Sequence, residues 1–296
     1  SLTNLSPDAP TIGTATATGT TTATVSFTAP ASDGGAPITL YTATSSPGGI
    51  TGTLAQAGSG TITVSGLTTD QAYTFTVTAT NSVGTSSASA ASNSVTPTSP
   101  EYVAATGGTI TTSGDYKIHT FNSSGTFTVS NAGNPLGSDT VDYLVLAGGA
   151  GGSVSTNVVG AGGGGAGGYR ESNPAPGTDW TGSPLSNPGG ALPVSAQGYP
   201  ITVGGGGGAA PGPGNRGADG SNSVFSTITS AGGGTGGYYG GSDSNYPGNS
   251  GGSGGGGSRS GPGGSGNTPS VSPPQGNNGT PNDGDGGGAG GGAGAT

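Results

Sequence analysis

The chain has 296 residues, of which 70 are glycine and 22 are proline, and only 28% are hydrophobic. Four lysines and arginines, far apart in sequence, stand against 13 aspartates and glutamates, so the net charge is −9. This balance excludes a nucleic-acid-binding protein and one attracted to anionic membranes, because both need clustered basic residues. Membrane insertion is excluded as well, since no apolar run approaches the roughly 20 residues that cross a bilayer.

Glycine content divides the chain into zones, because 53 of the 70 glycines follow residue 147. We interpret residues 1–9 as a linker, 10–98 as a β-sandwich, 101–147 as a β scaffold and 148–296 as a glycine-rich domain with exposed loops. No segment shows sustained i, i+3, i+4 apolar spacing, and glycine and threonine disfavour helix interiors. The predicted fold class is therefore all-β.

The first zone contains short alternating segments. Apolar residues alternate with threonine and serine over 23–27, 61–65 and 73–79. Turn sequences lie between them at Asp33-Gly34-Gly35 and Pro47-Gly48-Gly49. Each such strand has one apolar face to bury, so the pattern predicts two packed sheets.

Two stretches of this zone also resemble a known family. SFTAPASDGGAPITLY (26–41) and LTTDQAYTFTVTATNSVGTSSAS (67–89) are similar to fibronectin type III domains of the bacterial and phage kind. Tyr73, six residues after Leu67, matches the tyrosine corner of that family, which implies a hydrogen bond between its hydroxyl and nearby backbone. Phe27 stands where the family usually has a core tryptophan. The resemblance implies a fold, and such modules serve as spacers as often as binders.

The second zone is also strand-like. Apolar and polar residues alternate over 116–121, and Phe127 and Val129 share one face of the segment 125–129. The run 141–147 (VDYLVLA) is more continuously apolar, which predicts a strand covered on both faces. The third zone has bursts of glycine between loop-like stretches and no strand or helix period.

The glycine-rich zone needs a source of stability other than apolar side chains. Ordering a residue costs about 1–2 kcal/mol, and glycine loses the most freedom. Backbone hydrogen bonds, each worth roughly 1 kcal/mol net, remain available. A left-handed helix of three residues per turn directs its amides outward, so glycine on every side lets several neighbours bond to it. We predict a bundle of left-handed polyglycine-II helices for 148–296.

A second resemblance supports this prediction. Blocks at 114–130, 141–152, 160–170, 199–208 and 220–225 are similar in sequence and order to the glycine-rich domain of phage tail-fibre and receptor-binding proteins. The resemblance implies glycine helices packed as a sandwich, with distal loops that touch the host surface. The segment 261–296 departs from the pattern, because NTPSVSPPQGNNG interrupts its glycine rows.

Groups that carry out chemistry are sparse. The chain has no cysteine and a single histidine, His119, inside a predicted strand, so zinc sites are excluded and a cross-strand role is favoured. No carboxylate pair is placed for glycoside cleavage. Asp139–Asp142 and Asp283-Gly284-Asp285 have too few ligands for calcium. We therefore expect no enzyme activity, no metal and no cofactor.

The candidate binding residues are aromatic side chains in otherwise bare loops, namely Trp180, Tyr238, Tyr239 and Tyr246. Flat rings with a polar edge stack on sugars and anchor interfaces. The alternative is that these rings cap the ends of the glycine bundle.

Together these features predict an extracellular component of a phage virion fibre, an adhesin that binds a bacterial surface glycan or protein through those loops. Expected partners are that receptor and other virion proteins, and the chain can form a homo-oligomer. The alternative is a purely architectural subunit of a capsid fibre or bacterial surface filament. A third option, less favoured, is an ice-binding surface.

Overall fold

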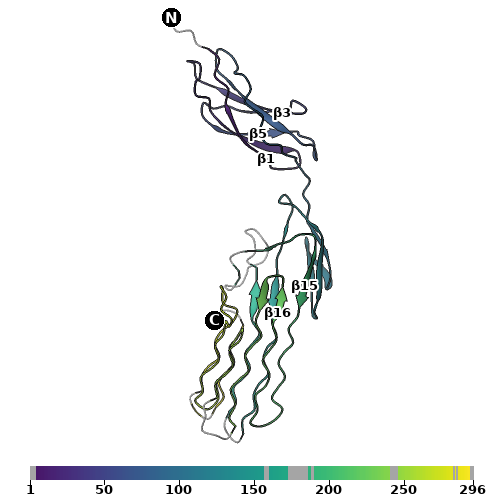
Figure 1. Ribbon diagram of the computed structural model, residues 1–296, viewed down its shortest axis with the longest axis vertical. Helices are drawn as coiled ribbons and strands as arrows, with labels where there is room; N and C mark the ends of the chain where they lie inside the picture. The colour runs from purple at the N-terminus through teal and green to yellow at the C-terminus, as the bar shows by residue number, and fades with distance from the viewer. Residues whose placement is uncertain are drawn as a thin grey trace. The chain divides into compact units, whose positions relative to one another are not determined.

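The computed structural model describes residues 5–156, 160–172, 186–187, 190–240, 246–282, 284 and 286–293. These residues form β-strands and irregular segments with no α-helix among them, as the fold class predicts. The chain divides into two compact units (Figure 1). The first comprises Ser1–Tyr102 with Gly133–Ser138, and the second comprises Val103–Ala132 with Asp139–Thr296.

The first unit contains two three-stranded antiparallel sheets. One sheet has the order β1 (Thr11–Ala17), β2 (Thr22–Thr28), β5 (Gly60–Ser65). The other has the order β4 (Thr51–Leu54), β3 (Leu40–Ser46), β6 (Thr74–Thr80). The three alternating segments predicted in this zone are β2, β5 and β6, and their apolar faces are buried between the sheets. The prediction of a fibronectin-type sandwich is confirmed.

Aromatic residues organise the core of this sandwich. Phe27 lies 4.3 Å from Tyr41, centroid to centroid, and both are buried. The Tyr41 hydroxyl donates to the Ala57 carbonyl at 3.1 Å, and burial raises the pKa of Tyr41 above its usual value. The Tyr73 hydroxyl accepts a hydrogen bond from the Thr68 amide at 3.0 Å, as the tyrosine-corner resemblance implies.

The second unit begins with a five-stranded antiparallel sheet. Its order is β17 (Ile228–Ser230), β16 (Ser223–Phe225), β15 (Gly198–Thr202), β10 (Gly125–Ala132), β7 (Val103–Thr106). Three two-stranded pairs accompany it: β8 (Thr109–Ser113) with β9 (Tyr116–Thr120), β11 (Thr140–Val141) with β14 (Leu192–Pro193), and β12 (Leu144–Leu146) with β13 (Tyr169–Glu171). Phe127 and Val129 lie in the buried core of this unit, as predicted.

One expectation for this region is wrong. The run 141–147 is not one strand covered on both faces, because it is split into β11 and β12, and Leu144 and Leu146 are 57% and 54% exposed. The split falls where the Tyr143 amide donates to the Ser172 hydroxyl, and only Val145 of β12 faces the core. The glycine-rich zone, whose sequence shows no strand period, also contains β13 to β17. These strands are too short for a period to be visible in the sequence.

Beyond these strands the glycine segments run side by side (Figure 1). Their hydrogen bonds recur every third residue, as a helix of three residues per turn requires. Three amides of the row 160–168 donate to the row 231–237, namely Gly162 to Gly237, Gly165 to Gly234 and Gly168 to Ala231. Its Gly163 and Ala166 amides donate to a different row, at Gly288 and Gly291. The bundle is therefore of the polyglycine-II type.

The row 251–258 lies inside the bundle, and every residue in it is buried. It hydrogen-bonds through backbone groups to rows around residues 163–166, 232–237, 277–280 and 288–291. Glycine is needed here for close approach, because a Cβ on Gly255 would lie 1.9 Å from the Thr235 carbonyl oxygen. Backbone hydrogen bonds thus take the place of an apolar core.

The segment 261–296 joins the same bundle despite its departure from the expected pattern. The Gly254 and Gly257 amides donate to the carbonyls of Asn277 and Thr280, and the Gly279 amide donates to Gly264. Gln275 is buried within the interrupting sequence, where its side-chain oxygen accepts from the Ala231 amide at 2.7 Å. A polar side chain therefore continues the hydrogen bonding where glycine is missing.

Candidate functional site

The candidate site lies at the end of the glycine bundle that is remote from the strands. The row 231–237 starts directly after β17, and Tyr238 and Tyr239 follow its last residue. The row 251–258 ends at Ser258, and an isolated β-bridge pairs Ser258 with Tyr246. The three loop tyrosines therefore come together because glycine rows begin and end beside them.

Tyrosine and arginine side chains form a mixed cluster at this end. The rings of Tyr238 and Tyr246 are stacked, with centroids 4.6 Å apart and planes inclined by 26°. The Arg216 guanidinium lies 5.7 Å from the centroid of Tyr238, and the Arg259 guanidinium lies 4.4 Å from that of Tyr239. We call these five residues the tip cluster. All five residues are half-buried.

A polar network holds the Arg216 side of the tip cluster. Arg216 donates to the Asn249 side-chain oxygen and, at 2.9 Å, to the Pro247 carbonyl. Asn249 donates to both carboxylate oxygens of Asp219 at 3.0 Å. That carboxylate also accepts from the Thr235 amide at 2.7 Å, inside a buried glycine row. The orientation of Arg216 is therefore coupled to the backbone of the bundle.

The Tyr239 side is fixed by the loop that follows the row 147–154. The Tyr239 amide donates to the Ser155 hydroxyl at 3.0 Å, and its carbonyl accepts from the Thr156 amide at 2.9 Å. The Thr156 hydroxyl donates to the same carbonyl at 3.1 Å. Tyr238 and Tyr239, which follow the row 231–237, are thus both held by segments distant in sequence.

The tip cluster has the chemistry of a binding surface. A guanidinium over an aromatic face is attracted by the ring and keeps N–H groups at its edge for a partner. Stacked tyrosines give rigid, amphipathic contact area with little rotamer entropy to lose. The described residues contain no group of three or more histidines, cysteines or carboxylates placed to hold a metal. No helix of membrane-spanning length and hydropathy occurs in the described ranges either.

The residues singled out from the sequence are placed as follows. Tyr238, Tyr239 and Tyr246 are brought together, whereas Trp180 lies outside the described residues. His119 has a structural, cross-strand place, with Nδ1 2.9 Å from the Gly107 carbonyl oxygen and its ring edge-on to Phe127.

Neither arginine of the tip cluster was expected from the sequence. Both stand inside or beside glycine bursts, in PGPGNRG and GGSRSGP, where a bulky cation is costly to accommodate in a row. That position is the feature of the sequence that could have identified them. Of the calcium candidates, Asp142 accepts from the Ser172 hydroxyl at 2.7 Å, and Asp283 and Asp285 lie outside the described residues.

Comparisons with known proteins identify both units. A family model described as a glycine-rich domain matches residues 120–296, and a model of the fibronectin type III domain matches residues 8–95. No curated protein matches the chain.

Solved structures that match the chain include titin kinase with its flanking domains, at 27% identity and a TM-score of 0.27, over 30% of this chain and 17% of that one. The twitchin kinase region of C. elegans matches at 25% identity and a TM-score of 0.27, over 32% of this chain and 17% of that one. The FN1–FN3 domains of chicken CNTN1 match at 20% identity and a TM-score of 0.28, over 48% of this chain and 47% of that one. The chain thus spans less than half the length of each of these structures.

Proposed function

This chain belongs to the glycine-rich domain family and carries a fibronectin type III domain before it, and from that premise we propose that it is an adhesin of a phage virion fibre. Both domains are typical of structural or adhesive proteins. In the proposed arrangement the sandwich is a spacer, the glycine bundle is a rigid support, and the tip cluster binds a glycan or protein on a bacterial surface.

One observation carries the proposal, namely the concentration of rings and cations at one end of a bundle otherwise made of glycine. Two of the four basic residues of the chain, Arg216 and Arg259, lie there with three tyrosines. Aromatic and arginine side chains are the residues most enriched at the energetic centres of interfaces. A capping role alone would need apolar area and no cations, so the arginines favour binding.

The test is binding of the fluorescently labelled chain to a panel of bacterial cells, measured by flow cytometry. The triple variant Tyr238→Ala, Tyr239→Ala, Tyr246→Ala is expected to lose binding to any strain that the unaltered chain labels. Tyr102→Ala is the matched control, because this tyrosine is 65% exposed and lies in the other unit. Equal labelling by the triple variant and the control would contradict the assignment of the tip cluster.

An architectural fibre or filament subunit is the second candidate, supported by a different observation. Leu144 and Leu146 of β12 are both more than half exposed, which is costly for an isolated chain and favours contact with another subunit. Electron microscopy of the assembled particle separates the two functions. A free end of the glycine bundle agrees with the adhesin, whereas tip clusters covered by neighbouring copies agree with the architectural role.

A further inference from the structure

One row of the glycine bundle has an open side. Residues 203–210, which we call the edge row, run on from β15 at one side of the bundle (Figure 1). Within the described part of the chain, the backbone hydrogen bonds of the edge row lead to two rows only, 147–154 and 217–222. The row 251–258, by contrast, bonds to four rows around it and is buried throughout. The edge row therefore has a side on which no other row is bonded to it.

Backbone groups on this open side have no partner in the protein. Among the described residues, no hydrogen bond is made by the amides of Gly205, Gly206, Gly208 and Ala209, and none is accepted by the carbonyls of Gly206 and Ala209. All four residues are exposed. The free groups recur every third residue, which is the spacing at which rows of this bundle bond to one another. Unpaired donors and acceptors along an edge are a template for pairing with another chain.

Side chains bond to the backbone at two other outer rows. In the row 217–222 the Asp219 carboxylate accepts from the Thr235 amide at 2.7 Å. In the segment 277–280 the Asn278 side-chain oxygen accepts from the Gly266 amide at 2.8 Å. The edge row has the sequence VGGGGGAA, without a polar side chain, so it cannot bond to backbone groups in this way. Its open side is left for another molecule.

The fold of a single chain does not require glycine on the open side. Gly205 and Gly208 have no positive φ, and a Cβ on either would meet no atom within 4 Å. Glycine increases the freedom of the unfolded chain, which lowers stability unless a close approach needs it. Within the bundle such an approach is made by neighbouring rows. At Gly205 and Gly208 a row from outside would make it.

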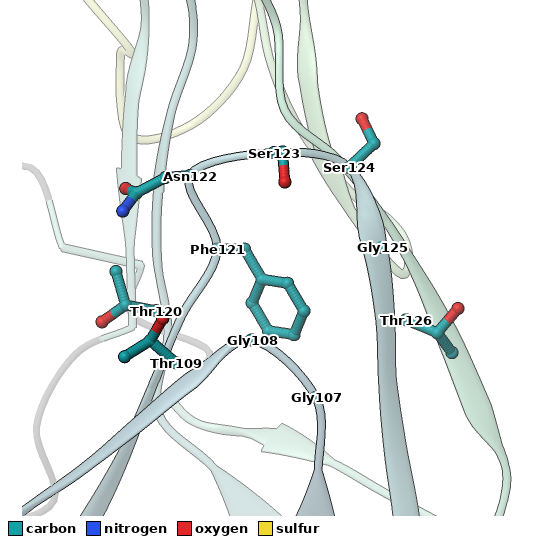
Figure 2. Close-up of a pocket in the computed structure, with 10 residues that line it drawn as sticks. All are labelled: Gly107, Gly108, Thr109, Thr120, Phe121, Asn122, Ser123, Ser124, Gly125 and Thr126. Atoms are coloured by element: carbon teal, nitrogen blue, oxygen red, sulfur yellow. The ribbon is translucent and has the colours of Figure 1, made fainter.

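The strands of the second unit hold the start of the edge row. The Val203 amide donates to the Ser124 hydroxyl at 3.0 Å, and the Gly204 amide donates to the Ser223 hydroxyl at 2.9 Å. Figure 2 shows Ser124 directly before β10, with its hydroxyl pointing away from the ring of Phe121. The edge row is therefore anchored at its first two residues, so its open side has a defined orientation.

We propose that the edge row pairs with the edge row of a second copy of this chain, so that two glycine bundles join. The partner must offer backbone groups every third residue and no bulky side chain, as a glycine row does, whereas a β-strand offers them every second residue. The edge row itself has these properties, and no residue in it is charged, so a second copy fits. A twofold axis makes the paired rows antiparallel, as rows 160–168 and 231–237 are within the bundle. The contact uses no residue of the tip cluster and is independent of the adhesin proposal.

The experiment is sedimentation velocity of the full chain over a wide range of protein concentrations, with NMR spectra of the ¹⁵N-labelled chain at the same concentrations. Sedimentation is expected to show a monomer–dimer equilibrium. The amide signals of Gly205, Gly206, Gly208 and Ala209 are expected to shift as the dimer forms. Those of the row 261–268 are expected to stay unchanged.

A pair of double variants tests the contact. Gly205→Lys with Gly208→Lys places two side chains on the open side, where they meet no atom of the same chain, and is expected to raise the Kd of the dimer about a hundredfold. Pro262→Lys with Ser265→Lys is the matched control, because it adds the same charge at the same spacing on exposed positions of another outer row. This control is expected to dimerise as the unaltered chain does.

Three results would overturn the proposal. The first is a chain that stays monomeric at every concentration, which would leave the edge row to a different glycine-rich protein or to water. The second is an equal dimer Kd for the two double variants, which would place the contact elsewhere, for example at Leu144 and Leu146. The third is a dimer whose formation leaves the edge-row amides unshifted. The triple tyrosine variant is expected to dimerise normally, so a failure of the adhesin proposal would not affect this result.

Discussion

Replacing Gly255 by alanine tests whether close backbone approach stabilises the bundle. The new Cβ would meet the Thr235 carbonyl oxygen at 1.9 Å, so the row 251–258 must move away from the row 232–237. Two hydrogen bonds join these rows near the contact, from the Gly234 amide to the Ser253 carbonyl at 2.9 Å and from the Gly237 amide to the Gly256 carbonyl at 2.8 Å. Losing both, with the buried groups left unpaired, is expected to cost about 3 kcal/mol of unfolding free energy.

The matched control is Gly205→Ala. Gly205 is exposed, has no positive φ, and its Cβ would meet no atom within 4 Å. Alanine there reduces the freedom of the unfolded chain and is expected to stabilise the protein by about 0.5 kcal/mol. Urea denaturation of both variants, followed by circular dichroism and NMR signals of the second unit, gives the two values. Equal effects of the two substitutions would refute the steric reasoning.

Other parts of the chain give three further predictions. The raised pKa of Tyr41 means that the folded sandwich holds this proton more tightly than the unfolded chain, so its stability is full below about pH 10 and falls as the pH rises further. Tyr41→Phe is expected to weaken this decline, as calorimetry at pH 9 and pH 11 would reveal. Tyr73→Phe leaves the Thr68 amide without its acceptor and is expected to cost about 1–2 kcal/mol in urea denaturation. Arg216→Lys cannot reproduce the two-pronged contact with Asn249 and Pro247, so amide exchange at the tip cluster is expected to accelerate while the sandwich is unaffected.

The sandwich was predictable because its strands bury one face each. The alternation of Tyr73, Phe75 and Val77 in sequence becomes alternation of buried and half-buried residues in β6. The same argument misplaced the run 141–147, since continuous apolar character does not distinguish a strand buried on both faces from one with Leu144 and Leu146 exposed.

The glycine bundle was predictable from the need to satisfy backbone amides, but its row order was not. A glycine burst has no side-chain pattern that specifies its neighbours, so the pairing of row 160–168 with row 231–237 could not be read from the sequence. For the same reason the sequence does not predict the contacts of Arg216 and Arg259 with tyrosines, although it does indicate the tyrosines as candidate binding residues. Local chemistry was visible in the sequence, whereas the proximity of distant segments was not.

Hydrogen–deuterium exchange of the glycine amides tests the central claim most directly. The claim is that backbone hydrogen bonds between rows 231–237 and 251–258, both fully buried, maintain the order of the second unit. These amides are expected to exchange as slowly as those of β10, through unfolding of the whole unit. Exchange at the rate of an unstructured peptide, while β10 stays protected, would contradict the account.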